Sequence, residues 1–172
     1  AGLAVEDVAG DVENLTLGDV THGDGDRSTG VGDFLAAHET VGGLEGNGAH
    51  EVITKVLSNF EDEKIEIKAG ELEMRNGVYF ENSKNVVLTI EPKFKSIVIS
   101  RCEGFVLNIR SCVSGIEIVG CKDVRVFVHE RTPSISVDAS QAVRVVLNEK
   151  NLECDIVSSK ASELTIAYEK ED

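Results

Sequence analysis

The sequence predicts an all-β protein, a parallel β-helix with rungs of about 19 residues, and three observations support this. When the chain from Val78 onward is written in rows of 19, five columns are apolar at 24 of 25 positions, where a 41% apolar composition would give about ten. Within each row the apolar residues alternate with other residues, which is the two-residue period of a strand with one buried face. A further column holds only small residues. Identical columns at a fixed short period are what stacked rungs require.

Each row predicts two short strands separated by a polar corner. The predicted strand pairs are 78–80 with 86–90, 97–99 with 105–109, 116–118 with 124–128, 135–137 with 143–147, and 154–156 with 162–166. The small column, which indicates a tight inward turn, is Ser83, Cys102, Cys121, Ser140 and Ser159. With strands about 4.8 Å apart, five rungs make a stack roughly 24 Å tall. A β-sandwich is the main rival, but its strands need not repeat at a constant interval.

Composition divides the chain near residue 50. Residues 1–63 hold 14 acidic residues against Arg27 and Lys55, whereas residues 64–172 hold 17 acidic and 15 basic residues. The Gly-rich, acidic composition of residues 1–50 predicts loop or poorly ordered chain, and residues 51–172 form the predicted β-helix domain. Composition leaves open whether residues 1–50 are native, an added leader or an extra rung.

The same composition excludes several classes of protein. A net charge of -14 argues against nucleic acid as a main partner, because phosphate is repelled. No membrane span or secretory signal is expected, because no apolar window is long enough and no basic-then-apolar leader opens the chain. The four cysteines are too sparse for a disulfide scaffold, so we expect reduced thiols in a cytoplasmic protein.

No site for metal, cofactor or catalysis is predicted. An EF-hand beginning at Asp24 would need Gly at position 29 and Glu at position 35, where Thr29 and Leu35 stand. His22, His38 and His50 lack neighbours at ligand spacing. No phosphate-binding loop, dinucleotide fingerprint or nucleophile elbow occurs. His129 has no placed partner, so we expect it to lie at the surface, and we expect the cysteines to be buried structural residues.

Several segments of the second part resemble the C-terminal domain of cyclase-associated protein, the actin-monomer regulator. The stretches that carry the resemblance are 132–138, 148–165, 78–85 and 118–124, of which 154–163 is the most specific. The resemblance implies a right-handed β-helix that dimerises by exchanging C-terminal strands, binds ADP-actin monomers, promotes their nucleotide exchange and associates with the cytoskeleton. It implies no enzymatic activity and no cofactor.

The sequence departs from the family's long members. It has about one predicted rung fewer, and it lacks the helical N-terminal domain and the polyproline stretches. It is therefore similar to a short form that consists of the actin-binding β-domain alone. Cyclase binding, profilin binding and assistance to filament severing do not carry over.

Candidate actin-binding residues come from the resembling motif and from the outward columns. Lys160 and Glu163 belong to the motif, and Arg144 and Lys150 are expected beside them. In the row alignment Glu163 follows Arg144 one rung later, so the two could simply pair. Phe127 and Val146, flanked by Arg125, predict an exposed apolar stripe with arginine at its rim, unless residues 1–50 or a corner loop cover it.

The last row predicts a homodimer. An open β-helix ends in a free strand edge, which invites pairing with a second copy. The residues expected at that interface are Cys154, Ile156, Leu164, Ile166 and Tyr168.

Two alternative functions share this architecture. A relative of tubulin-folding cofactor C would supply an arginine finger to a GTPase, with Arg101 as the candidate. However, the sequence around Arg101 lacks the Gln-x-Arg arrangement of that branch. A polysaccharide-active β-helix would need clustered carboxylates on one outer face, which the outward columns do not provide.

Overall fold

A computed structural model of the chain describes residues 4–8, 39–40 and 54–170. The rejected calcium loop at Asp24 and the histidines His22, His38 and His50 lie outside these residues.

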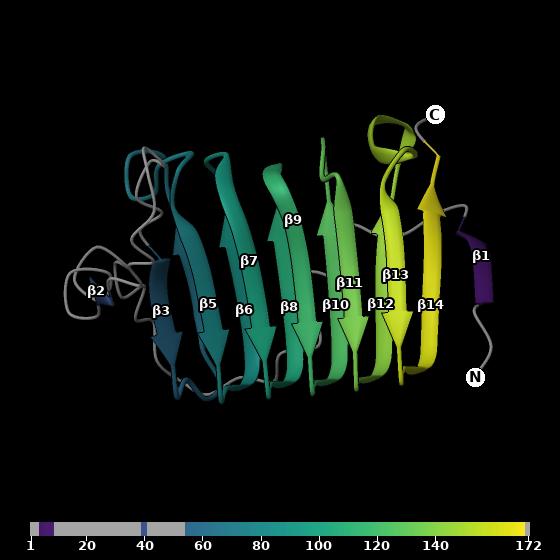
Figure 1. Cartoon of the computed structure of the whole chain (residues 1–172), viewed down its shortest axis with the longest axis horizontal. Helices are drawn as coiled ribbons and strands as arrows, with labels where there is room; N and C mark the ends of the chain where they lie inside the picture. The colour runs from purple at the N-terminus through teal and green to yellow at the C-terminus, as the bar shows by residue number, and fades with distance from the viewer. Residues whose placement is uncertain (1–3, 9–38, 41–53, 171–172) are drawn as a thin grey trace, which may run out of the picture.

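The described chain is a parallel β-helix of six rungs, which confirms the predicted architecture (Figure 1). Each rung contributes one strand to each of two sheets. The first sheet contains β4 (Lys64–Ile67), β6 (Lys84–Ile90), β8 (Glu103–Ile109), β10 (Lys122–Val128), β12 (Gln141–Leu147) and β14 (Ser162–Glu169). The second contains β3 (Thr54–Ser58), β5 (Gly77–Glu81), β7 (Phe94–Ser100), β9 (Cys112–Val119), β11 (Ser134–Asp138) and β13 (Asp155–Ser159).

The central rungs follow the predicted spacing. Val78 pairs with Ile97, Ile97 with Ile116, and Ile116 with Ile135, so the rows of the sequence are the rungs of the structure. The first rung, β3 with β4, was not predicted as a row. Thr54 pairs with Gly77, so this rung is four residues longer than the central ones and breaks the column pattern.

The predicted register of the last rung is wrong by two residues, because Ile135 pairs with Ile156 rather than Cys154. The two extra residues fall in a single 3₁₀ turn, η1 (Glu149–Asn151), which begins with a capping box between Asn148 and Asn151. Asn151 is buried, and its side-chain amide donates to the carbonyl of Val128 at 2.8 Å, which fixes the turn against the previous rung. The column of Val86, Phe105, Val124 and Val143 therefore ends in Leu164, not Ser162.

The small corner column forms a hydrogen-bonded ladder. The Ser140 hydroxyl accepts the backbone N–H of Cys121, one rung earlier, at 3.0 Å and donates to the carbonyl of Asp138 at 2.8 Å. Ser83 does the same with Phe60 and Glu81, at 3.1 and 2.9 Å. The small residues are thus needed for their polar atom as well as for their size. In the last rung Ala161 takes this position instead of the predicted Ser159, because of the shifted register.

Two residues in every corner have a left-handed backbone. In the last corner they are Lys160 (φ 52°) and Glu163 (φ 55°), and in the one before it Ala139 (φ 48°) and Ala142 (φ 54°). This conformation is strained for residues with a Cβ atom, and it is imposed by the ladder and the strands on either side.

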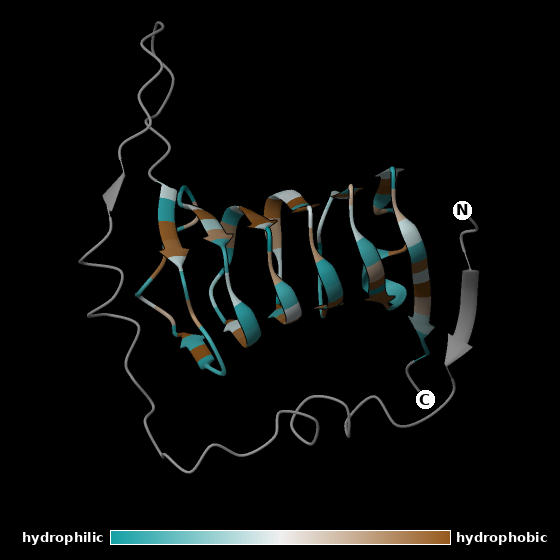
Figure 2. Ribbon diagram, turned by 90° about the horizontal axis from the view of Figure 1, so that it is seen from below, coloured by the Kyte–Doolittle hydropathy of each residue, from teal (hydrophilic) through white to brown (hydrophobic). Residues whose placement is uncertain are grey.

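The core is a continuous column of apolar side chains between the two sheets. Along the strands hydrophobic and hydrophilic residues alternate, as the brown and teal bands show (Figure 2). At the N-terminal end the rings of Phe60, Phe80 and Phe105 contact one another through three successive rungs, tilted in the first pair and edge-to-face in the second, with centroid distances of 5.6 and 4.9 Å. Aromatic burial therefore anchors the first rungs, whereas smaller aliphatic residues fill the later ones.

Two short strands outside the rungs extend the sheets. The first, β1 (Ala4–Val8), pairs parallel with β14, so Val5 lies opposite Ile166 (Figure 1). The second, β2 (Glu39–Thr40), pairs antiparallel with β3. The outer edge of β14 is therefore covered by β1. Within the described residues, the free edge at this end belongs to β13.

Candidate functional site

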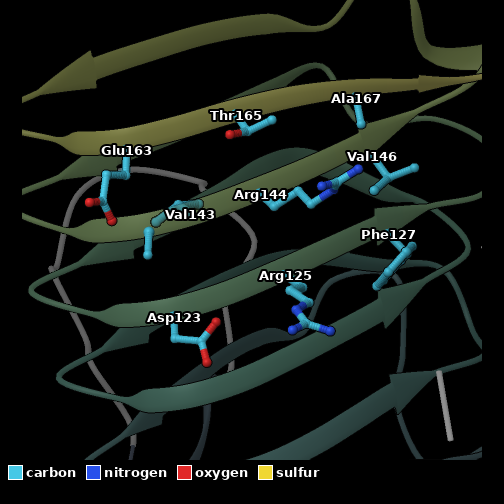
Figure 3. A pocket seen from close by; sticks show the side chains of 10 residues that line it. Asp123, Arg125, Phe127, Val143, Arg144, Val146, Glu163, Thr165 and Ala167 are labelled. Carbon is cyan, nitrogen blue, oxygen red and sulfur yellow. The ribbon is translucent and has the colours of Figure 1, made fainter. Parts of the chain in front are cut away.

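A groove crosses the outer face of β10, β12 and β14 and encloses about 370 Å³. Its walls change character from one end to the other (Figure 3). Asp123 and Glu163 lie at the end next to the corner, and the arginines occupy the middle. The apolar end is formed by Phe127, Val146 and Ala167.

The strand alternation places both arginines on the outer face. Val124 and Val126 point into the core, so Arg125 between them points outward, and the same holds for Arg144. Arg125 and Arg144 are directly opposite each other on adjacent strands, and both side chains are half-buried. Like charges opposite each other weaken a sheet. Asp123 and Glu163 line the same groove, so the positive charge of the pair lies beside acidic residues, and it suits a partner that carries carboxylates.

The apolar end of the groove is not the exposed stripe that the sequence predicted. Phe127 and Val146 are each only 4% exposed, and Ala167 is fully buried. The three side chains lie in register across β10, β12 and β14 and form an apolar cluster of their own, with half-buried Val106 against it. This cluster gives the groove a packed apolar floor at one end.

The structure also corrects the predicted pairing of Arg144 with Glu163. Arg144 lies opposite Thr165, because the 3₁₀ turn shifts the last rung by two residues. Both Arg144 and Glu163 still line the groove. The same shift brings Ala167 under Val146, a groove residue that the sequence reasoning missed. Asp123, near the start of β10, was missed as well.

Lys160 and Lys150 lie outside this groove. Lys160 is exposed in the last corner, where it lines a second, open groove together with Arg101 and Lys122. Lys150 belongs to η1, which follows the far end of β12, and its backbone N–H donates to the Asn148 side chain at 2.9 Å. Five of the seven predicted binding residues thus share one groove, and two do not.

The predicted dimer residues surround the last rung. Leu164 is buried, whereas Cys154, Ile156, Ile166 and Tyr168 are half-buried. Nearby Leu152 and Val157 are 61% and 60% exposed, and Val157 belongs to β13, whose outer edge has no strand partner among the described residues. This end of the β-helix offers both apolar area and a free strand edge.

The remaining candidates for chemistry are separate from one another. Arg101 is exposed and forms an ion pair with Glu81 at 2.6 Å. His129 is exposed and is hydrogen-bonded through Nε2 to the side chain of Asn108. In residues 54–170 and the two short strands, no group of three or more His, Cys, Asp or Glu residues could hold a metal ion. No helix in that part of the chain is long and apolar enough to cross a membrane.

The fold places the chain among the parallel β-solenoid proteins. Comparison with known proteins identifies its family within this class. A family model described as "Adenylate cyclase associated (CAP) C terminal" matches residues 50–172. Adenylyl cyclase-associated protein 2 of Mus musculus is 27% identical over 113 residues, which cover 66% of this chain and 24% of that protein. The adenylyl cyclase-associated protein of Dictyostelium discoideum is 32% identical over 101 residues, or 59% of this chain and 22% of that protein.

A solved structure agrees with the sequence comparisons. The crystal structure of cyclase-associated protein from Cryptosporidium parvum matches with a TM-score of 0.64 and 26% identity, covering 76% of this chain and 82% of that one. The chain therefore belongs to the family of cyclase-associated protein C-terminal domains. It spans about a quarter of the length of the first curated relatives.

Proposed function

We propose that residues 51–172 bind monomeric actin, favour its ADP-bound form and accelerate exchange of its nucleotide, without catalysing a covalent step. The proposal places the protein in the cytoplasm, associated with the cytoskeleton. Residues 1–50 have no part in actin binding. Membership in the family and the resemblance of the last rung to its actin-binding domain support this function.

The observation that carries the proposal is the groove on β10, β12 and β14. Five of the residues expected to bind actin line it, although they come from three rungs. Because actin is acidic, the opposed Arg125 and Arg144 favour encounter with it, and the packed apolar cluster beside them fixes the shape of the groove. The acidic residues at the corner end set the orientation of the partner, because they repel other carboxylates.

Reversal of the two arginines tests the groove. The double variant Arg125→Glu/Arg144→Glu reverses both charges beside Asp123 and Glu163, so urea unfolding is used first to verify that the variant is folded. We expect it to weaken binding of ADP-actin by roughly tenfold. Native mass spectrometry and the exchange rate of a fluorescent nucleotide on ADP-actin measure the effect.

A matched control uses the first rung of the same sheet. Lys64 and Lys68 are exposed on and beside β4, at the other end of the stack, and Lys64→Glu/Lys68→Glu makes the same change of charge. The control should bind actin nearly as well as the wild type. If both double variants lost actin affinity equally, the groove would not be the actin-binding site, and the loss would reflect only the change in overall charge. A wild-type protein that leaves both actin polymerisation and nucleotide exchange unchanged would refute actin regulation altogether.

Lys160 tests a second surface. The substitution Lys160→Glu changes the corner groove that contains Arg101 and Lys122, on a different part of the molecule from Arg125. We expect weaker actin binding with unchanged dimerisation and thermal unfolding. Unchanged binding would confine the actin site to the groove on β10, β12 and β14.

We propose a homodimer formed through the last rung. Pairing through the free edge of β13 is compatible with β1 on β14, and it would cover exposed Val157. Removal of residues from Asp155 onward should give a monomer or an aggregate. A full-length chain that sediments as a monomer at tens of micromolar would contradict the dimer.

A further inference from the structure

Two cysteine thiols lie together in the corner groove. This open groove of about 450 Å³ is lined by both Cys102 and Cys121, with the basic residues Arg101 and Lys122 next to them in the chain. Each cysteine is only 2–3% exposed, so the thiols form the floor of the groove rather than its rim. The other two cysteines, Cys112 and Cys154, do not line it.

The corner ladder places the two cysteines next to each other on adjacent rungs. Cys102 and Cys121 occupy the same column on adjacent rungs, and the backbone N–H of Cys102 donates to Sγ of Cys121 at 3.5 Å. The rungs are joined at this point by the N–H of Lys122, which donates to the carbonyl of Cys102 at 3.0 Å. Adjacent strands lie about 4.8 Å apart. That spacing falls within the Cα separation of roughly 4.4–6.8 Å that a disulfide spans.

The two thiols also differ in acidity. The Cys102 side chain and, after it, the Cys102 backbone N–H lower the pKa of Cys121 despite burial. The same contact and burial raise the pKa of Cys102. Cys121 is therefore the more acidic of the two thiols and the one that more readily gives the thiolate, which is the nucleophile in thiol oxidation, whereas Cys102 keeps its proton.

We propose that Cys102 and Cys121 are a redox pair that hydrogen peroxide converts to a disulfide across two rungs. The thiolate of Cys121 attacks one oxygen of the peroxide, the O–O bond breaks, and hydroxide leaves with a sulfenic acid on Cys121. The sulfur of Cys102 then attacks that of Cys121, and the S–O bond breaks. Hydroxide leaves and takes up the proton of the Cys102 thiol as water. The two sulfurs lose two electrons in total, and the peroxide gains them.

The other two cysteines are poor candidates for the same reaction. Cys112 is buried against the hydroxyl of Thr132 at 3.1 Å, and burial raises its pKa. Burial also raises the pKa of Cys154, to about 11. Both therefore remain protonated at neutral pH, which makes them slow to oxidise.

The fold supplies a matched control for the test. Ser83 and Ser140 occupy the same column, and their hydroxyls make the same ladder contacts that the thiols make. Cys102→Ser and Cys121→Ser should therefore fold with the ladder intact, which urea unfolding verifies. Cys112→Ser/Cys154→Ser leaves only the proposed pair.

The experiment treats folded protein with hydrogen peroxide, quenches it, and counts free thiols under denaturant. The wild type should fall from four free thiols to two and lose the mass of two hydrogen atoms, with a linked peptide that contains both Cys102 and Cys121. Cys112→Ser/Cys154→Ser should fall from two thiols to none. A reducing agent should restore every thiol.

Single variants separate the roles of the two sulfurs. Cys102→Ser should stop at a sulfenic acid on Cys121 that dimedone captures, whereas Cys121→Ser should resist peroxide. Four free thiols in treated, folded wild type would overturn the proposal. A disulfide that forms equally in Cys121→Ser, or that links Cys112 with Cys154, would overturn it as well.

Discussion

Removal of the Ser140 hydroxyl should destabilise the β-helix far more than the size of the change suggests. In Ser140→Ala the buried backbone N–H of Cys121 loses its acceptor at 3.0 Å, whereas the carbonyl of Asp138 loses the hydroxyl at 2.8 Å but keeps the N–H of Gly120 at 3.0 Å. An unsatisfied buried group costs about 1–3 kcal/mol. Since the lost oxygen leaves only a small void, we expect a loss of about 2–3 kcal/mol in the free energy of unfolding.

Ser140→Cys is the matched control for this prediction. A thiol already performs the same task at Cys121, where Sγ accepts from the Cys102 N–H at 3.5 Å and donates to the Val119 carbonyl at 3.3 Å. Ser140→Cys should therefore cost less than about 1 kcal/mol. Urea unfolding at one fixed protein concentration measures both variants, and the alanine variant should shift the midpoint by roughly 1 M. If alanine and cysteine are equally destabilising, or if alanine costs under about 0.5 kcal/mol, the ladder is not what stabilises the corner.

Two further predictions concern glycine and thiol chemistry. Gly115→Ala should destabilise the protein by about 2 kcal/mol or more, because a Cβ atom would lie 2.5 Å from Oγ and 2.7 Å from the carbonyl oxygen of Ser134, at φ 142°. Gly77→Ala, where the nearest atom would be 3.4 Å away, is its control in thermal unfolding, and equal melting temperatures would contradict the steric argument. Cys154 should react slowly with iodoacetamide at pH 8 in the folded protein and faster as the pH approaches 11, because burial raises its pKa to about 11 and only the thiolate reacts. A reaction in the folded chain as fast as in the unfolded chain at pH 8 would contradict the raised pKa.

The central rungs could be predicted from sequence because each side chain stacks on its counterpart one rung away. Val78, Ile97, Ile116 and Ile135 form one such column, and any insertion between them would have broken it. The ends of the stack were harder. The first rung is four residues longer than the central ones, and the capping box at Asn148 adds two residues to the last. Neither insertion changes the alternation within a strand, so periodicity alone could not reveal it.

The candidate site was predictable in part for the same reason. Alternation correctly placed Arg125 and Arg144 side by side on the outer face. Burial of Phe127 and Val146 was not predicted, because alternation assigns a face to a residue but does not tell how much of that face is open to water. The strand β1 could not be predicted either, since five residues with two acids among them carry no strand period.

The pairing of β1 with β14 means that the order of strands in space differs from their order of synthesis. The strands of neighbouring rungs pair residues that are close in sequence, such as Val78 and Ile97. The pairing of Val5 with Ile166 instead joins the two ends of the described chain. The entropy of loop closure makes that contact about 2 kcal/mol costlier than a contact between rungs. Each rung can dock as soon as it leaves the ribosome, because its partner has just been made. The strand β1 has to wait for β14, so the sheet that contains both is completed only after every rung has been synthesised.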